Sequence, residues 1–201
     1  MSRIVSGVAG GTPLVSVPGS LTRPTTDRVK EALFSRLDAF DVLAGSRVLD
    51  LYAGSGSLGV ESASRGAAAV DLVEFDAKAS AVCQRNADLI NGVLGQKAVT
   101  VHRSRVESFL ERTADETLWD VVFLDPPYPL DQPALAAVLA KLAGHLAAGA
   151  VVVVERSSRS HEPEWPAGLE RFADKKYGET RLWFAEPASG QQVDVGPVPE
   201  D

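Results

Sequence analysis

The stretch LDLYAGSGSLG at residues 49–59 decides the fold, because it joins an apolar run to a glycine-rich turn. The run RVLDLY at 47–52 is typical of a buried strand, and Gly54, Gly56 and Gly59 complete the pattern G-x-G-x-x-G. The residues LGVESASRG at 58–66 predict a helix that Gly66 ends. A strand, a glycine turn and a helix in this order indicate the first unit of an α/β sheet.

The same alternation continues along the chain. Strands are expected at 47–52, 69–75, 98–102, 118–125 and 150–155, and helices at 58–66, 76–91, 106–112 and 131–146. Gly92 is expected to end the second of these helices, and Leu146 to lie on the apolar face of the last. Residues 169–177 and 180–186 predict a terminal antiparallel hairpin. We therefore predict an α/β fold with a mostly parallel sheet.

The two ends of the chain differ from this core. RIVSGV and PLVSV, within the first 22 residues, alternate as in a small hairpin or arm. RPTTDRVKEALFSRL then predicts a helix capped by Thr26 or Asp27. Residues 188–201 are acidic and too poor in apolar side chains to fold. The expected division is an arm at 1–22, a domain at 23–187 and a disordered tail at 188–201.

The composition and the charge limit the classes of protein to which the chain can belong. The chain has 201 residues, 45% of them hydrophobic, and one cysteine, which suits one globular domain without a disulfide. We find no export signal, membrane span or metal-ligand spacing, and expect a cytoplasmic monomer. The net charge of −7 argues against a general nucleic-acid coat, although residues 1–36 carry five basic side chains against two acidic ones.

Three motifs lie at the expected carboxyl ends of strands, where such sheets bind ligands. They are the glycine stretch at 50–59, the acid pair around Glu74 and Asp76, and DPPY at 125–128. Because parallel strands end at the same edge, these motifs outline one crevice.

The glycine pattern alone leaves several interpretations open. Glu74 lies 20 residues after Gly54, which suits the ribose of a nicotinamide dinucleotide, and a plain strand-to-helix turn is also consistent. A phosphate-binding P-loop is excluded, because Val60 stands where its lysine would be. Asp50 would repel a pyrophosphate but suits a ligand with an ammonium and a sulfonium, such as S-adenosylmethionine. In that interpretation Asp50 lies near the amino-acid end and Glu74 accepts hydrogen bonds from both ribose hydroxyls.

The motif DPPY favours methyl transfer to an exocyclic base amine. Such an amine is a poor nucleophile, because its lone pair is delocalised into the ring. Asp125 and the carbonyl of Pro126 are the acceptors that its protons need. Pro126 and Pro127 stiffen the turn, and the ring of Tyr128 offers a face on which an extruded base stacks.

Together these residues resemble the class I S-adenosylmethionine-dependent methyltransferases that act on an exocyclic amine. RPTTDRVKEALF at 23–34, ahead of that core, is similar to the RsmD-type bacterial enzymes that modify a guanine of 16S ribosomal RNA at N2. The resemblance covers roughly residues 3–186. It implies a Rossmann-like, seven-stranded sheet with an antiparallel last strand, and 16S ribosomal RNA in an assembling small subunit as the partner.

The resemblance also implies a set of site residues. Those expected at the cofactor are Asp50, Tyr52, Ala53, Gly54, Ser55, Gly56, Glu74, Phe75, Arg105 and Val106. Arg105 and Val106 match the place where such enzymes contact the adenine, but many relatives have an acid or amide at the first. Arg23, Thr25 and Arg28 are expected beside the active-site mouth, near cofactor and RNA.

The chain departs from the family in its arm, because VAGGTPLVSVPGS at 8–20 contains none of the basic residues that relatives tend to carry. The main alternative is an adenine or cytosine amino-methyltransferase that acts on DNA. A non-catalytic RNA-binding chaperone with this fold would be expected to lose Asp125 or the glycine turn, and both are present.

Overall fold

The chain forms one seven-stranded mixed sheet in the order β3-β2-β1-β4-β5-β7-β6. The computed structural model describes residues 2–19, 26–127 and 130–189. The strands are β1 (Arg47–Leu51), β2 (Ala69–Glu74), β3 (Val99–Arg103), β4 (Trp119–Leu124), β5 (Leu146–Ser157), β6 (Leu169–Tyr177) and β7 (Thr180–Pro187). Strands β1 to β5 pair in parallel, and β7 inserts antiparallel between β5 and β6. The α/β class and the antiparallel last strand are therefore confirmed.

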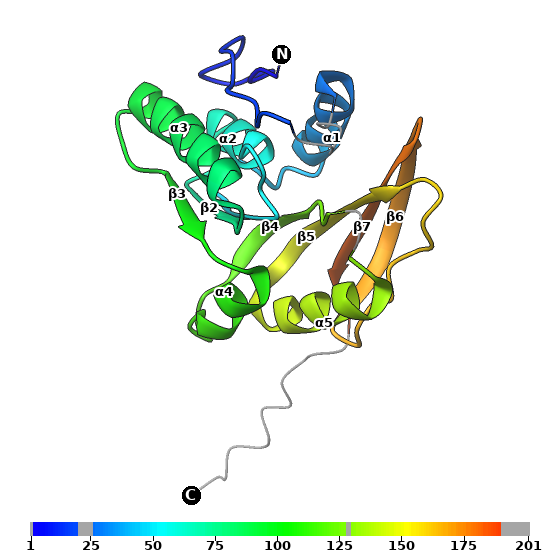
Figure 1. Ribbon diagram of the computed structural model, residues 1–201. Coiled ribbons are helices and arrows are strands. Elements are labelled where there is room, and N and C mark those ends of the chain that lie inside the picture. Colours follow the sequence, from blue (N-terminus) through cyan, green and yellow to red (C-terminus); the bar gives the residue numbers. More distant parts are fainter. Residues whose placement is uncertain (1, 20–25, 128–129, 190–201) are drawn as a thin grey trace, which may run out of the picture.

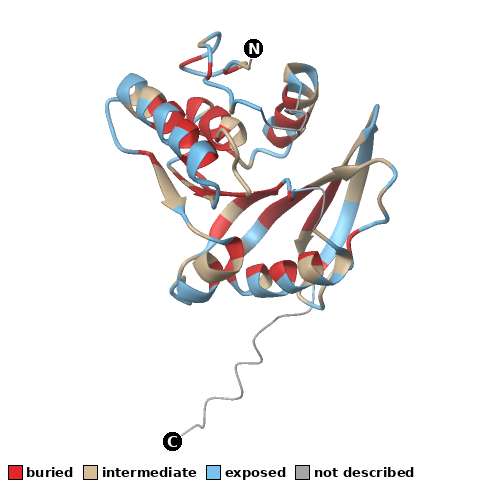
Figure 2. Cartoon of the chain, in the orientation of Figure 1, coloured by how far each residue is buried: buried red, intermediate tan, exposed pale blue. Residues whose placement is uncertain are grey.

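Helices cover both faces of the sheet (Figure 1). They are α1 (Asp27–Ala39), α2 (Ser57–Ser64), α3 (Ala77–Leu94), α4 (Val106–Arg112) and α5 (Gln132–Leu142). The first three lie over one face, and α4 and α5 lie over the other. The apolar core correspondingly has two halves, one on each face of the sheet. Figure 2 shows the buried residues on the central strands and on the sides of the helices that face them.

Most predicted helix ends agree with the structure, and two are wrong. Thr26 caps α1 by accepting a hydrogen bond from the Val29 amide at 3.3 Å, as predicted. Helix α3 does not end at Gly92 but continues to Leu94, where Gly95 takes the left-handed conformation. Asn91 explains the extra turn, because its side chain bonds the backbone of Ala98 and Val99 and so holds the helix end against β3.

The prediction for Leu146 is also wrong. Helix α5 ends at Leu142, a short 3-10 turn covers Ala143–His145, and Leu146 is the first residue of β5. The apolar spacing misleads because Leu146 still packs against the same half of the core as α5. Leu146 would contact this half of the core whether it belonged to a helix or to a strand.

The predicted N-terminal hairpin is present. Arg3 and Pro13 form an antiparallel bridge, and the Ile4 amide donates to the Thr12 carbonyl at 2.9 Å. Ile4 and Leu14 are buried in the same half of the core as the apolar residues of α1 and α2. No helix in the described part of the chain is long and apolar enough to cross a membrane.

Candidate active site

The glycine turn between β1 and α2 is built from left-handed backbone. Gly54 and Gly56 have φ of +57° and +78°, and Tyr52 shares this conformation with φ of +60°. A Cβ at Gly54 would meet no atom within 4 Å, so this glycine faces open space at the carboxyl edge of the sheet. The backbone there is open to the close approach of a ligand.

Gly59 has a packing reason instead. A Cβ at this position would lie 2.2 Å from Leu72 Cδ2 on β2, so only glycine lets α2 lie this close to the sheet. Gly56 combines the left-handed backbone of Gly54 with the tight packing of Gly59. A Cβ at Gly56 would lie 2.9 Å from the sulfur of buried Cys83.

Asp50 lies beneath the turn, with 2% of its surface exposed. Its Oδ2 accepts a hydrogen bond from the Gly59 amide at 3.2 Å. Burial raises the pKa of Asp50 to about 7, and the nearby Glu74 carboxylate adds to the rise, against the effect of the Gly59 bond. An acid in this state gains its negative charge easily when a positive charge binds beside it.

Glu74 links two of the predicted motifs. Its Oε2 accepts from the Gly54 amide and its Oε1 accepts from the Asp76 amide, each at 2.8 Å. The carboxylate is half-buried at the end of β2 and retains further acceptor capacity, since each oxygen has two lone pairs.

Phe75 and Arg105, both expected at the cofactor, form a contact next to Glu74. Phe75 follows Glu74 directly, and Arg105 is the residue directly before α4. The Phe75 ring is 56% exposed, and the Arg105 guanidinium lies over it, 4.3 Å from its centre. Val106 is buried as the first residue of α4. A flat aromatic ring with this exposure is suited to stacking.

Asp125 directly follows β4, which pairs with β1, so it stands beside the glycine turn at the carboxyl edge. Asp125 as a whole residue is exposed and Pro126 is buried, although the carboxyl group of Asp125 itself has protein packed around it. The protein packed around this carboxyl raises its pKa, and the carboxyls of Glu155 and Asp50 raise it further, against the opposing charge of Arg156.

Arg156 is a residue that the sequence analysis missed. Its Nη2 donates to the Leu130 carbonyl at 3.0 Å, and the Leu130 amide donates to the Pro127 carbonyl at 2.9 Å. Arg156 therefore supports the end of the loop that begins at Asp125. Arg156 directly follows the expected strand 150–155, and no sequence pattern there distinguishes it from an arginine exposed on the surface.

The predicted RNA-contacting residues are only partly described. Arg23, Thr25 and Tyr128 lie outside the described residues, and Arg28 is exposed on α1. Residues 1–36 present less positive charge at the surface than their composition indicates, because Lys30 is fully buried and Arg3 pairs with Asp27 at 3.6 Å. The sequence does not reveal the burial of Lys30, because its buried partner Glu61 lies on a different helix.

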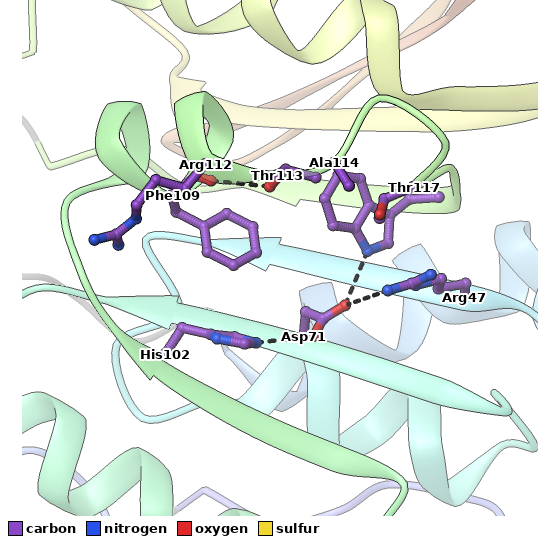
Figure 3. Close-up of a pocket in the computed structure, with 9 residues that line it drawn as sticks. Arg47, Asp71, His102, Phe109, Arg112, Thr113, Ala114 and Thr117 are labelled. Carbon is purple, nitrogen blue, oxygen red and sulfur yellow. Dashed lines mark hydrogen bonds and ion pairs between the residues drawn. The ribbon is translucent and has the colours of Figure 1, made fainter.

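A separate cavity of about 320 Å³ lies under α4, near the amino ends of β1 and β4 (Figure 3). Asp71 is at its centre and bonds His102 Nε2 at 2.9 Å and Trp119 Nε1 at 3.0 Å. Burial tends to raise the pKa of Asp71, but these two bonds and the charge of Arg47 lower it overall. Asp71 thus binds three of the other residues that line this cavity, away from the carboxyl-edge motifs.

Comparison with known proteins extends over nearly the whole chain. The model of the family described as "Conserved hypothetical protein 95" matches residues 2–186. Ribosomal RNA small subunit methyltransferase D of Escherichia coli is 35% identical over 198 residues, 96% of this chain and 94% of that protein. The chain belongs to the RsmD family of methyltransferases. A solved structure agrees: the Escherichia coli protein yhhF has a TM-score of 0.77 and 32% identity over 92% of this chain and 97% of its own.

More distant structures show how widely the RsmD-type fold occurs. Magnesium protoporphyrin IX methyltransferase from Synechocystis, solved with bound S-adenosylmethionine, is 17% identical with a TM-score of 0.61, over 80% of this chain and 79% of its own. At this identity the likeness concerns the fold alone. Through its family, this RsmD-type chain is an S-adenosylmethionine-dependent methyltransferase.

Proposed function

We propose that the protein transfers a methyl group from S-adenosylmethionine to the exocyclic N2 amine of a guanine in 16S ribosomal RNA, in an assembling small ribosomal subunit. The observation that carries the proposal is the position of Asp125 and Pro126, directly after β4 and beside the glycine turn of β1. The relative that is named a small-subunit ribosomal RNA methyltransferase, 35% identical over 96% of the chain, supports the choice of substrate.

The residues around the turn fit the cofactor. The open backbone at Gly54 admits it, and Glu74 offers carboxylate oxygens for its ribose hydroxyls. The exposed ring of Phe75 suits the adenine, with Arg105 and Val106 alongside. Asp50, buried beneath the turn, offers a negative charge to the ammonium group at the amino-acid end of the cofactor. Tyr52, Ala53, Ser55 and Gly56 complete the turn.

When bound, S-adenosylmethionine supplies a methyl group on a positively charged sulfur. The protein's own contribution is to orient the amine. Asp125 and the Pro126 carbonyl accept hydrogen bonds from the amine protons and so direct its lone pair toward the methyl group. Only the ionised carboxylate attracts the partial positive charge that develops on the nitrogen. Because the pKa of Asp125 is raised, we expect the rate of transfer to increase with pH through that pKa.

The remaining roles concern the RNA. Arg28 is exposed on α1 and can neutralise a phosphate, which positions RNA without reading its sequence. Arg23, Thr25 and the base-stacking Tyr128 are proposed from the family resemblance, since they lie outside the described residues.

The proposal is tested with radiolabelled S-adenosylmethionine and three substrates in parallel: small ribosomal subunits, naked 16S ribosomal RNA and duplex DNA. We expect label in RNA. We expect more label in small subunits than in naked RNA, because ribosomal proteins can add contacts that this acidic chain does not make with phosphates. The Asp125→Ala variant serves as the negative control, and Asp115→Ala, which removes an exposed carboxylate, as the matched positive control. Label in DNA alone would contradict the proposal and favour a DNA amino-methyltransferase.

A further inference from the structure

The N-terminal hairpin lies directly against α2, near the glycine turn (Figure 1). The Val8 amide donates to the Ser64 carbonyl at 2.8 Å, and the Ala9 amide donates to Ser64 Oγ at 3.0 Å. A Cβ at Gly7 would lie 1.9 Å from the Ser64 carbonyl oxygen, so this approach is possible only for glycine. The hairpin is therefore packed on the helix that the glycine turn begins.

Asn86 of α3 bonds the hairpin and the turn at the same time. Its Oδ1 accepts from the Val15 amide at 2.9 Å, and its Nδ2 donates to the Val15 carbonyl at 3.0 Å. The second Nδ2 proton goes to the Ser55 carbonyl, inside the glycine turn, at 2.8 Å. The side chain is fully buried, so each of these bonds is costly to lose.

Lys30 of α1 makes the same kind of connection from the other side. Its Nζ donates to the Arg3 carbonyl in the hairpin and to Ser57 Oγ, at the start of α2, at 3.0 Å. Burial lowers the pKa of Lys30, and the buried partner Glu61, 3.7 Å away, opposes this. Glu61 in turn accepts from the hairpin amide of Val5 at 2.7 Å.

Both buried side chains thus join the same two segments. The hairpin is poorly suited to hold RNA, because Arg3 is the one charged residue between positions 2 and 19, and Arg3 pairs with Asp27. We propose that the hairpin is a positioning element of the cofactor site, and that Asn86 and Lys30 are the positioning residues through which it fixes the glycine turn. This inference rests on the proposed function, because it assumes that the turn binds S-adenosylmethionine.

The proposal predicts which constants change. Loss of either connection leaves the turn free to leave its binding conformation, so the affinity for the cofactor falls. The groups proposed to contact the amine are elsewhere, at the end of β4, and Arg28 is exposed on α1 whereas Lys30 of the same helix is buried. The KM for S-adenosylmethionine is therefore expected to rise, while the KM for RNA and kcat at saturating cofactor stay unchanged.

The test is calorimetric titration of the full-length protein with S-adenosylhomocysteine, together with steady-state kinetics. We expect Asn86→Ala to weaken binding about tenfold, the cost of one to two buried hydrogen bonds. Ser57→Ala, which removes the acceptor of Lys30 on α2 and leaves its bond to the Arg3 carbonyl, is expected to weaken it severalfold. Gln84→Ala removes an exposed amide from the same helix as Asn86 and should leave the affinity unchanged.

The outcomes separate this inference from the function on which it rests. If the wild-type protein does not bind S-adenosylhomocysteine, the proposed function fails. If it binds and both variants bind equally well, the positioning role is wrong, even where their melting temperatures fall. A raised KM for RNA with unchanged cofactor affinity would also overturn it. Should Asn86→Ala not fold, Ser57→Ala decides, because its side chain is only partly buried.

Discussion

Replacing Asp50 with asparagine should stabilise the cofactor-free protein at neutral and alkaline pH. Asp50 is 2% exposed, and burial raises its pKa from 3.8 to about 7. The folded state therefore holds a proton that the unfolded chain releases at a lower pH. The stability that this proton contributes is complete below pH 3.8 and is lost as the pH rises to about 7.

The size of the effect follows from the pKa difference. Between pH 5 and pH 7 the unfolded chain is ionised at this residue and the folded chain is not, so about two pH units separate the limits. At about 1.4 kcal/mol per unit, the wild-type protein loses about 3 kcal/mol of unfolding free energy relative to Asp50→Asn over this range. The amide oxygen of the asparagine can still accept from the Gly59 amide, so the turn keeps its support.

Urea denaturation of both proteins at pH 5, 6, 7 and 8, without cofactor, measures this difference. Subtracting the two curves cancels the titration of the groups that they share. Asp115→Asn, which removes an exposed carboxyl group, is the matched control. An equal pH dependence in the wild-type protein and Asp50→Asn would refute the reasoning, because Asp50 would then titrate alike in the folded and unfolded states.

Three further predictions concern other parts of the site. Asp125→Ala should abolish methyl transfer while the affinity for S-adenosylhomocysteine, measured by calorimetry, changes less than about threefold. A large loss of affinity would mean that Asp125 holds cofactor rather than amine. Phe75→Ala should weaken the same affinity about tenfold or more through lost stacking, whereas Arg105→Ala should have a smaller effect. The reverse order would assign the adenine contact to the guanidinium. Gly59→Ala should lower the unfolding free energy by about 1–3 kcal/mol, because its Cβ would lie 2.2 Å from Leu72 Cδ2. Gly92→Ala in α3, with open space around it, should instead be neutral or raise it, and equal effects in urea denaturation would contradict this packing argument.

The fold was largely predictable, because burial leaves a periodic mark on the sequence. Each parallel strand is a short apolar run, and the motifs at their carboxyl ends fall together once the strands are parallel. The two errors in helix and strand assignment, at Gly92 and Leu146, arise where different local structures satisfy the same burial. Only tertiary contacts, such as the Asn91 side chain on the backbone of β3, decide between them.

The charged and polar interior was not predictable in the same way. Lys30 stands among exposed charges in the sequence, and nothing there indicates that Glu61 is buried beside it. Asn86 shares an apolar helix face with Val82 and Ile90, yet its three bonds go to segments that are 71 and 31 residues away in the chain. Long-range pairing of this kind leaves no spacing for a sequence pattern to detect.

The central claim is that the carboxyl group after β4 directs methyl transfer to N2 of a guanine in 16S ribosomal RNA. Its most direct test is to digest RNA from a reaction of the protein with small ribosomal subunits and to identify the methylated nucleoside by mass spectrometry. The account predicts N2-methylguanosine with the wild-type protein and none with Asp125→Ala. A methylated adenosine or cytidine, or undiminished N2-methylguanosine from Asp125→Ala, would contradict it.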